Sequence, residues 1–275
     1  MSQPDPYFPS AAPKPPAPAG GPAQMEYLRS FNYIFENPNW LMNLVWSFLC
    51  QMAGQFIPIL PGMVFAGYQF EMLEDLHNNG GTRYPDFDIN RLTDYLGRGV
   101  WPILVLLLYA LLAVFLGIGF FIATMICGGI LGGAAGDDFG PLIVMFGFLL
   151  GFLIVGLIVA GLAIYCTPMM IRAGLTQELG AAFDFRWVND FVAKMWVETV
   201  LSSLFVFFSV FGLIVVTCGV AGIVLGPMMP FVSTHLMYQL YSLYVSRGGI
   251  PIAFKPRMAA GYIPPPPGYV PPPQY

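Results

Sequence analysis

The chain has 275 residues, of which 57% are apolar and 9% are charged. An ordinary soluble domain carries roughly 25% charged residues, and several uncharged stretches here exceed the ~20 residues that a helix needs to cross a bilayer. This composition argues against a soluble protein and indicates a polytopic protein embedded in the lipid bilayer. The net charge of −4, with no basic block, argues against nucleic acid as a partner.

Motifs that carry chemistry are few. The four cysteines lie far apart inside apolar runs without a C-x-x-C or Cys/His cluster, so we expect no metal and no redox site. The two histidines are His77 and His235, and the chain contains no G-x-S-x-G or H-E-x-x-H motif. We therefore expect a protein that is not an enzyme and that uses no cofactor.

The two ends of the chain are rich in proline. Residues 1–24 hold eight prolines, and the C-terminus reads "GYIPPPPGYVPPPQY". Proline lacks the backbone donor and fixes φ, so both tails should be extended, solvated and disordered. The expected organisation is a disordered Pro-rich tail (1–24), a transmembrane helical domain (25–250) and a disordered Pro/Tyr-rich tail (251–275).

Five apolar stretches follow one another between the tails. They cover residues 39–60, 100–131, 141–171, 196–225 and 227–245. A weaker sixth stretch, Pro61–Asn78, carries three acidic residues near its end. As a helix it spans ~27 Å, barely enough to cross the hydrocarbon core. We expect six transmembrane passes, with five as the alternative.

A charged decamer precedes two of these stretches, as "FDINRLTDYL" (87–96) and "FDFRWVNDFV" (183–192). On a helix each copy has one apolar face, made of Phe87, Leu92, Tyr95 and Leu96 in the first copy and of Phe183, Trp187, Val188 and Phe191 in the second. Such segments lie in the membrane interface with that face toward lipid. A looser third copy at 27–35 precedes the first pass. The predicted fold is an all-α polytopic membrane helix bundle of three hairpin-like units, each preceded by an interfacial amphipathic helix.

Basic residues near the helix ends set the orientation. They occur in two loops and after the last stretch, as Arg83, Arg91 and Arg98, as Arg172, Arg186 and Lys194, and as Arg247, Lys255 and Arg257. The remaining turns contain no Lys or Arg. With six passes all three groups, and both tails, face the cytoplasm, and we expect a multi-pass protein of the cell membrane.

Four short motifs carry a resemblance to a known family. "FENPNW" (35–40), "IPILP" (57–61), "GY" (67–68) and "YPDFD" (84–88) together resemble a family of prokaryotic integral membrane proteins known as a domain of unknown function (number 4013). The resemblance extends over about residues 30–250 and leaves out both tails. In the family basic residues often follow the Gly-Tyr pair, whereas this chain has Gln69, Phe70 and Glu71 there. The resemblance implies membrane residence and no known chemistry.

Polar residues inside a pass are the first functional leads, because hydrocarbon makes them costly unless their hydrogen bonds are satisfied. Asn43, Ser47, Gln51 and Gln55 recur at i+4 and form a polar seam on the first pass. The functional interpretation is the wall of a solute cavity. The packing interpretation is hydrogen bonding between helices at ~0.6 kcal/mol per contact, and we favour it.

A second polar site lies in the last pass, where His235 and Gln239 occur in "STHLMYQLY". Histidine titrates near neutral pH and could relay a proton. We favour instead a neutral histidine that is hydrogen-bonded to a neighbouring hydroxyl or carbonyl.

The tails offer a different lead, two Pro-Pro-x-Tyr peptides. Their residues are Pro266, Pro267, Tyr269, Pro272, Pro273 and Tyr275. Such peptides dock into aromatic grooves with little entropy left to lose, although a tail of biased composition explains them as well. We therefore expect a non-enzymatic membrane protein that organises or anchors cytoplasmic partners through its tails. The alternative is a small-solute or lipid transporter that uses the polar seam. Small-xxx-small pairs such as Gly147/Gly151 are also compatible with a homo-oligomer.

Overall fold

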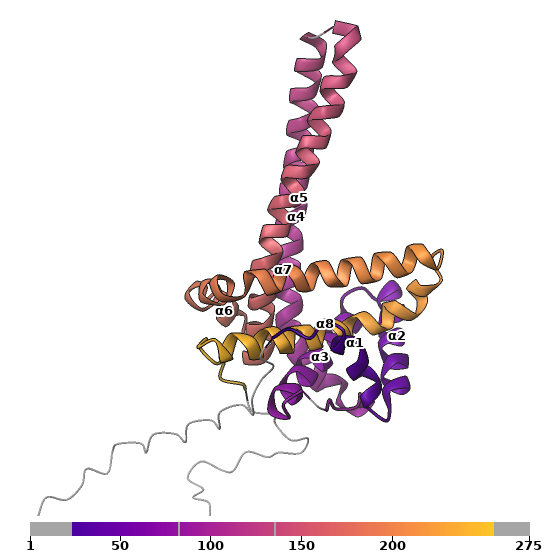
Figure 1. The fold of residues 1–275 in the computed structure, drawn as a ribbon, viewed down its shortest axis with the longest axis vertical. Coiled ribbons are helices and arrows are strands. Elements are labelled where there is room, and N and C mark those ends of the chain that lie inside the picture. Colours follow the sequence, from indigo (N-terminus) through magenta and orange to yellow (C-terminus); the bar gives the residue numbers. More distant parts are fainter. Residues whose placement is uncertain (1–23, 82, 135, 256–275) are drawn as a thin grey trace, which may run out of the picture.

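The computed structural model describes residues 24–81, 83–134 and 136–255, and all the regular elements in these ranges are helical (Figure 1). In chain order they are α1 (Arg29–Asn32), the 3-10 helix η1 (Tyr33–Glu36), α2 (Trp40–Phe56), α3 (Leu60–Asn78), the 3-10 helix η2 (Ile89–Arg91), α4 (Leu92–Ala134), α5 (Gly136–Thr176), α6 (Leu179–Ala182), α7 (Phe185–Val216) and α8 (Ala221–Ser246). This agrees with the predicted all-α class.

Helices α4 and α5 form a long hairpin that projects from the rest of the molecule (Figure 1). Between Val100 and Ala134, and again between Gly140 and Ile171, the sequence contains no charged residue. Large apolar side chains point outward along both helices, with Phe115 72% and Phe152 84% exposed. We call this projecting pair, from Leu106 to Ile158, the hairpin.

The remaining helices and the foot of the hairpin form a helical body with an aromatic core. Its largest fully buried side chains include Tyr33, Tyr68, Tyr95, Tyr241, Tyr244, Phe70, Phe191 and Phe231. Helix α8 contributes most of its length to this core. Helix α7 lies across the hairpin instead of beside it (Figure 1).

Helices α3 and α4 make the closest helix contact of the body. A Cβ on Gly67 would overlap the carbonyl oxygen of Tyr95, and one on Gly99 would overlap that of Met63. The two backbones therefore touch, and neither position has room for a side chain.

The decamers differ from the prediction. The first copy runs through η2 into α4 and the second opens α7, so neither is a separate interfacial helix. Of the residues predicted to face lipid, Phe87, Tyr95, Trp187, Val188 and Phe191 lie in the protein core, whereas Leu92 and Phe183 are exposed. For the five buried residues the predicted environment was wrong, because an apolar face packs equally well against protein.

Three helical segments are long and apolar enough to cross a membrane: Ile89–Ala134, Phe139–Thr176 and Phe185–Val216. The other three expected passes correspond to α2, α3 and α8. Helix α2 has 17 residues, α3 carries two buried glutamates, and α8 is largely buried among protein side chains. The three long helices are consistent with a membrane protein.

The C-terminal segment also differs from the prediction over its first residues. Residues 251–255 were assigned to a disordered tail, but they lie extended on the body. The Ile252 amide donates to the Tyr241 hydroxyl (2.8 Å), and the Lys255 amide donates to the Leu175 carbonyl (3.3 Å). Residues 1–23 and 256–275, which include the Pro-Pro-x-Tyr peptides, lie outside the described residues.

Candidate functional site

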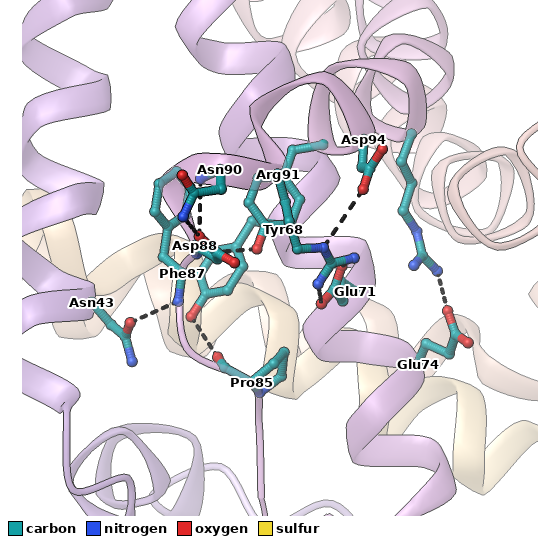
Figure 2. Close-up of polar contacts among 12 residues, drawn as sticks. Asn43, Tyr68, Glu71, Glu74, Pro85, Phe87, Asp88, Asn90, Arg91 and Asp94 are labelled. Carbon is teal, nitrogen blue, oxygen red and sulfur yellow. Dashed lines mark hydrogen bonds and ion pairs between the residues drawn. The ribbon is translucent and has the colours of Figure 1, made fainter. Parts of the chain in front are cut away.

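The densest polar contacts of the body surround an extended segment, residues 84–88, between α3 and η2 (Figure 2). The Tyr68 hydroxyl donates to the Pro85 carbonyl (2.8 Å), and the Phe87 amide donates to Asn43 Oδ1 (3.0 Å). The Asp88 amide donates to the Tyr95 hydroxyl (3.2 Å). Helices α2, α3 and α4 thus each bind this segment through one side chain. We call the segment and these side chains the polar junction.

Three asparagines bind the carboxylate of Asp86 in the same segment. Asn37 and Asn43 donate to Oδ1, each at 3.0 Å, and Asn39 donates to Oδ2 at 2.6 Å. Burial raises the pKa of the Asp86 carboxyl, but the three amide donors outweigh it and the pKa is lowered overall. The result is an ionised carboxylate that ties the start of α2 to the α3–α4 connection.

Two ion pairs join α3 to the start of α4 beside this segment. Arg91 binds Glu71 through two parallel hydrogen bonds, at 2.6 and 2.8 Å (Figure 2). Arg98 binds Glu74 at 2.6 Å. The side chains of Arg98 and Glu74 are only 6% and 9% exposed. Two-point guanidinium–carboxylate contacts fix geometry as well as charge. The pairs therefore set the register of α3 against α4.

The polar junction, the asparagines that bind Asp86 and the two ion pairs together hold α2, α3 and α4 against one another, and we call this set of contacts the clasp. The chemistry available in the clasp is structural. Its carboxylates are bound to amides or guanidinium groups and its tyrosines to backbone groups, with no nucleophile beside a base. Within the described residues, no group of three or more His, Cys, Asp or Glu side chains is placed to hold a metal ion.

Three of the four motifs that carried the family resemblance meet in this clasp. "FENPNW" supplies Asn37 and Asn39, "GY" supplies Tyr68, and "YPDFD" supplies the segment that they bind. The chain belongs to the family described as protein of unknown function (DUF4013). The family model matches residues 52–226, more than half of the chain. The predicted family is thus confirmed over a shorter range than expected, and "FENPNW" lies outside the match. Neither the curated proteins nor the solved structures contain a match to this chain.

Two of the four residues of the polar seam, Ser47 and Gln51, bind α8, whereas Asn43 binds the polar junction. Asn43 and Ser47 are buried, and the Ser47 hydroxyl donates to the Pro227 carbonyl (2.9 Å). Gln51 Nε2 donates to the Gly226 carbonyl (2.9 Å). That carbonyl has no helical donor because residue 230, four positions on, is a proline. Gln55, the last member, is exposed. These contacts favour the packing interpretation of the seam.

Side chains also donate to two carbonyls further along α8, although these two are not freed by a proline. Gln69 Nε2 donates to the Pro230 carbonyl (2.9 Å), and the Tyr33 hydroxyl donates to the Phe231 carbonyl (2.8 Å). Side chains from η1, α2 and α3 thus bind four carbonyls of α8, those of residues 226, 227, 230 and 231. These contacts hold the proline-containing part of α8 against the other helices of the body.

His235 and Gln239 form a buried network with the N-terminal segment. Gln239 exchanges two hydrogen bonds with the backbone of Glu26, at 2.6 Å to its Oε1 and 3.0 Å from its Nε2. Gln239 Nε2 also lies 2.9 Å from His235 Nδ1, and the Ser30 hydroxyl lies 3.0 Å from the same nitrogen. An amide donor at Nδ1 places the ring proton on Nε2. That nitrogen is buried and has no hydrogen-bond partner among the described residues. The Tyr33 ring stacks on the imidazole at 4.3 Å.

The clasp itself was missed by the sequence analysis, which gave no role to Asn37, Asn39, Asp86 or Glu74. A usable signal existed in the family motifs, because they concentrate Asn, Asp and Tyr in segments outside the apolar stretches. The sequence alone does not show which of these segments bind each other. Asn37 and Asp86, for example, are 49 positions apart in the chain.

Proposed function

We propose that this protein is a multi-pass membrane protein without enzymatic activity that anchors cytoplasmic partners at the bilayer through its proline-rich tails. The observation that carries the membrane part is the hairpin, whose two charged residues, Asp137 and Asp138, lie next to each other at its turn. Along both helices the hairpin exposes large apolar side chains. In water this surface would far exceed the largest apolar patches of soluble monomers.

The length of the hairpin supports this placement. From Leu106, where α4 becomes exposed, to Ala134 the helix is about 43 Å long at ~1.5 Å per residue. A bilayer with its headgroup regions is ~40–45 Å thick. The hairpin thus has the length to cross the bilayer twice and to present its glycine-rich turn on the far side.

The positions of the two tails support the proposal that they anchor partners, because both described ends of the chain are hydrogen-bonded to the body. The Glu26 backbone is bound by Gln239, and the Lys255 amide by Leu175. The tails therefore start from the body and not from the hairpin turn. Partners that bind the Pro-Pro-x-Tyr peptides would then be concentrated beside the membrane on that side.

A second arrangement, with six passes, is favoured by a second apolar surface. Phe56, Ile57, Val216 and Ile223 are exposed around the α2–α3 and α7–α8 turns, and the Gln51–Gly226 contact brings these two regions together. Six passes would place this surface in lipid as well. Because α7 lies across the hairpin, that arrangement requires the hairpin to turn relative to the body (Figure 1).

Cysteine labelling in intact cells distinguishes these arrangements. In a background without the four native cysteines, single substitutions Gly133→Cys, Ile57→Cys, Val220→Cys and Lys255→Cys are exposed to a membrane-impermeant maleimide. Labelling of Gly133→Cys alone indicates a spanning hairpin on a body at the inner face. Labelling of Gly133→Cys, Ile57→Cys and Val220→Cys indicates six passes. Labelling of Gly133→Cys only after lysis would refute a spanning hairpin in this orientation.

Photo-crosslinking tests the anchoring part. A photoreactive residue at Val270, between the two Pro-Pro-x-Tyr peptides, should give protein adducts in native membranes. The adducts should disappear in the Tyr269→Ala/Tyr275→Ala variant, whereas Tyr7→Ala, in the other tail, is the matched control. Adducts that persist in the double variant would show that these peptides do not recruit partners.

A further inference from the structure

A cavity of about 560 Å³ lies at the foot of α5, on the body. Its walls come from the end of α5, the α5–α6 turn, the start of α7 and the extended segment 250–255. That segment is fixed in place, because Trp187 Nε1 donates to the Ile250 carbonyl (2.8 Å) and the Ile252 amide donates to the Tyr241 hydroxyl (2.8 Å). The cavity is therefore a built feature of the fold and has the size of a small-molecule site.

Two cations from separate elements line this cavity, Arg172 and Lys255. The Arg172 guanidinium lies 5.2 Å from the centre of the Trp187 ring, and its Nη2 binds Asp184 at 2.7 Å. That partner is 42% exposed, so the ion pair is a weak one, and a guanidinium has further donors to offer. The Lys255 ammonium forms no ion pair with any residue that the structure describes.

The rest of the lining consists of one acid and a largely apolar wall. Glu178 is the carboxylate among the lining residues, and Ile250, Pro251 and Ile252 form much of the wall on the C-terminal segment. Cations beside apolar groups suit an amphiphile whose charged end is anionic. Arg172 is also the first charged residue after the uncharged run of α5. It lies about 21 Å along the helix from Ile158, at the foot of the hairpin, so lipid headgroups reach it when the body is partly immersed in the bilayer.

We propose that this cavity binds a singly charged phosphate ester, the headgroup of an anionic phospholipid, between Arg172 and Lys255. The assignment to lipid rests on the proposed function, since it requires α5 to enter the bilayer at this point. A bound headgroup would fix the C-terminal segment, and hence the start of the tail, at the membrane surface.

Thermal melting of the full chain in uncharged detergent tests the proposal. Short-chain phosphatidylglycerol should raise the melting temperature in a saturable way, whereas phosphatidylcholine of the same chain length should not. Inorganic phosphate and glycerophosphoglycerol identify the source of the ligand, because a free phosphate site would respond to them as strongly as to the lipid. No response to any phosphate compound would overturn the proposal.

Charge variants localise the effect to the cavity. Lys255→Gln should weaken phosphatidylglycerol binding about fivefold, the equivalent of ~1 kcal/mol. Glu178→Gln should tighten it by a similar factor. Arg83→Gln, an exposed cation outside the cavity, should leave it unchanged. Arg172→Gln should also weaken binding, but it frees Asp184, so Lys255 and Glu178 are the decisive positions.

The phosphate site and the proposed function can fail independently, and the experiments distinguish the two failures. Equal losses in Lys255→Gln and Arg83→Gln, or no change in Glu178→Gln, would overturn the site while Gly133→Cys labelling still shows a spanning hairpin. A hairpin that does not span, together with an intact charge dependence, would keep the phosphate site and remove its assignment to lipid.

Discussion

The helical body and the hairpin are stabilised in opposite ways. In the body, side chains from distant segments bind one another, as in Asn39–Asp86 and Arg98–Glu74. Along the hairpin the described polar side chains bond mainly within their own helix, such as Thr124 to the Phe120 carbonyl, and one contact, from the Tyr109 hydroxyl to the Val159 carbonyl (3.0 Å), joins the two helices near the foot.

This difference shows where specificity comes from in each region. In the body, buried amides and carboxylates, and the Gly226 carbonyl that Pro230 leaves free, find their partners on distant segments, and these contacts favour one arrangement. The hairpin needs only complementary shape, since lipid tails are as apolar as its side chains and give no hydrophobic drive to helix pairing.

The largest effect is expected for Gly99→Ala, at the α3–α4 backbone contact. The new methyl group would overlap the Met63 carbonyl, so the two helices must separate. We expect a loss above ~4 kcal/mol or failure to fold. Gly97→Ala, two residues away in open space, should be neutral or stabilise by up to ~1 kcal/mol. Thermal melting in detergent compares the two, and similar melting temperatures would contradict the close contact.

In the hairpin, Gly151 is the glycine to compare with Gly99 of the body, because it also lies against another helix. A methyl group there would overlap the ring of Phe120, a side chain that can turn aside. Gly151→Ala should therefore cost about 1–3 kcal/mol, the range of overpacking, and less than Gly99→Ala. The reverse ranking would mean that the hairpin is packed as strictly as the body.

The next effect concerns the buried ion pair. Glu74→Ala leaves the Arg98 guanidinium buried without that carboxylate and should cost ~3–5 kcal/mol. The double variant Glu74→Met/Arg98→Met should recover most of the loss. Glu26→Ala removes an exposed partner of Arg29 and should cost at most ~1 kcal/mol. Equal melting temperatures for Glu74→Ala and Glu26→Ala would show that burial of the pair has no energetic consequence.

The two regions were not equally predictable from the sequence. Val100–Ala134 has no charge, and this composition alone predicts its length and its apolar exterior. The environment of the decamers could not be predicted from composition in the same way, because one apolar face on a helix is compatible with lipid or with a protein core. Trp187 and Phe191 lie in the core because α8 supplies Tyr244 at ring contact, a pairing that local pattern does not contain.

The seam shows the same limit on a smaller scale. The i+4 spacing predicts one face of α2, and the favoured interpretation named hydrogen bonds between helices. Ser47 and Gln51 donate to backbone carbonyls of α8, and the Gly226 carbonyl is free because of Pro230, whereas Asn43 binds the α3–α4 connection. Proline in a helix thus predicts a carbonyl that needs a donor, but the choice of Gln51 as that donor depends on the tertiary fold.

A graded loss is therefore expected along the seam. Asn43→Ala removes the partner of the buried Phe87 amide and one donor to Asp86, and should cost ~1–3 kcal/mol. Gln55→Ala, at the exposed end, should change stability by less than ~0.5 kcal/mol. Melting temperatures of the two variants measure the gradient. A solute flux in proteoliposomes that Gln55→Ala abolishes without loss of stability would support the transporter alternative instead.

The smallest effect is the acid response of the Asp86 clasp. Its carboxyl pKa lies below the usual 3.8 in the folded protein because three asparagines donate to it. A depressed pKa stabilises the fold above the usual value, and this contribution is lost as the pH falls from that value through the folded pKa. Between neutral pH and pH ~3 the native chain should therefore lose more stability than Asp86→Asn, whose side chain does not titrate.

Both chains are melted in detergent over this range. The difference between their melting temperatures isolates the contribution of Asp86, because all other titrating groups are shared. Asp86 is exposed to solvent, so the difference should be modest and should shrink at high salt. Parallel acid responses of the two chains would show that the asparagines bind Asp86 without favouring its ionised form.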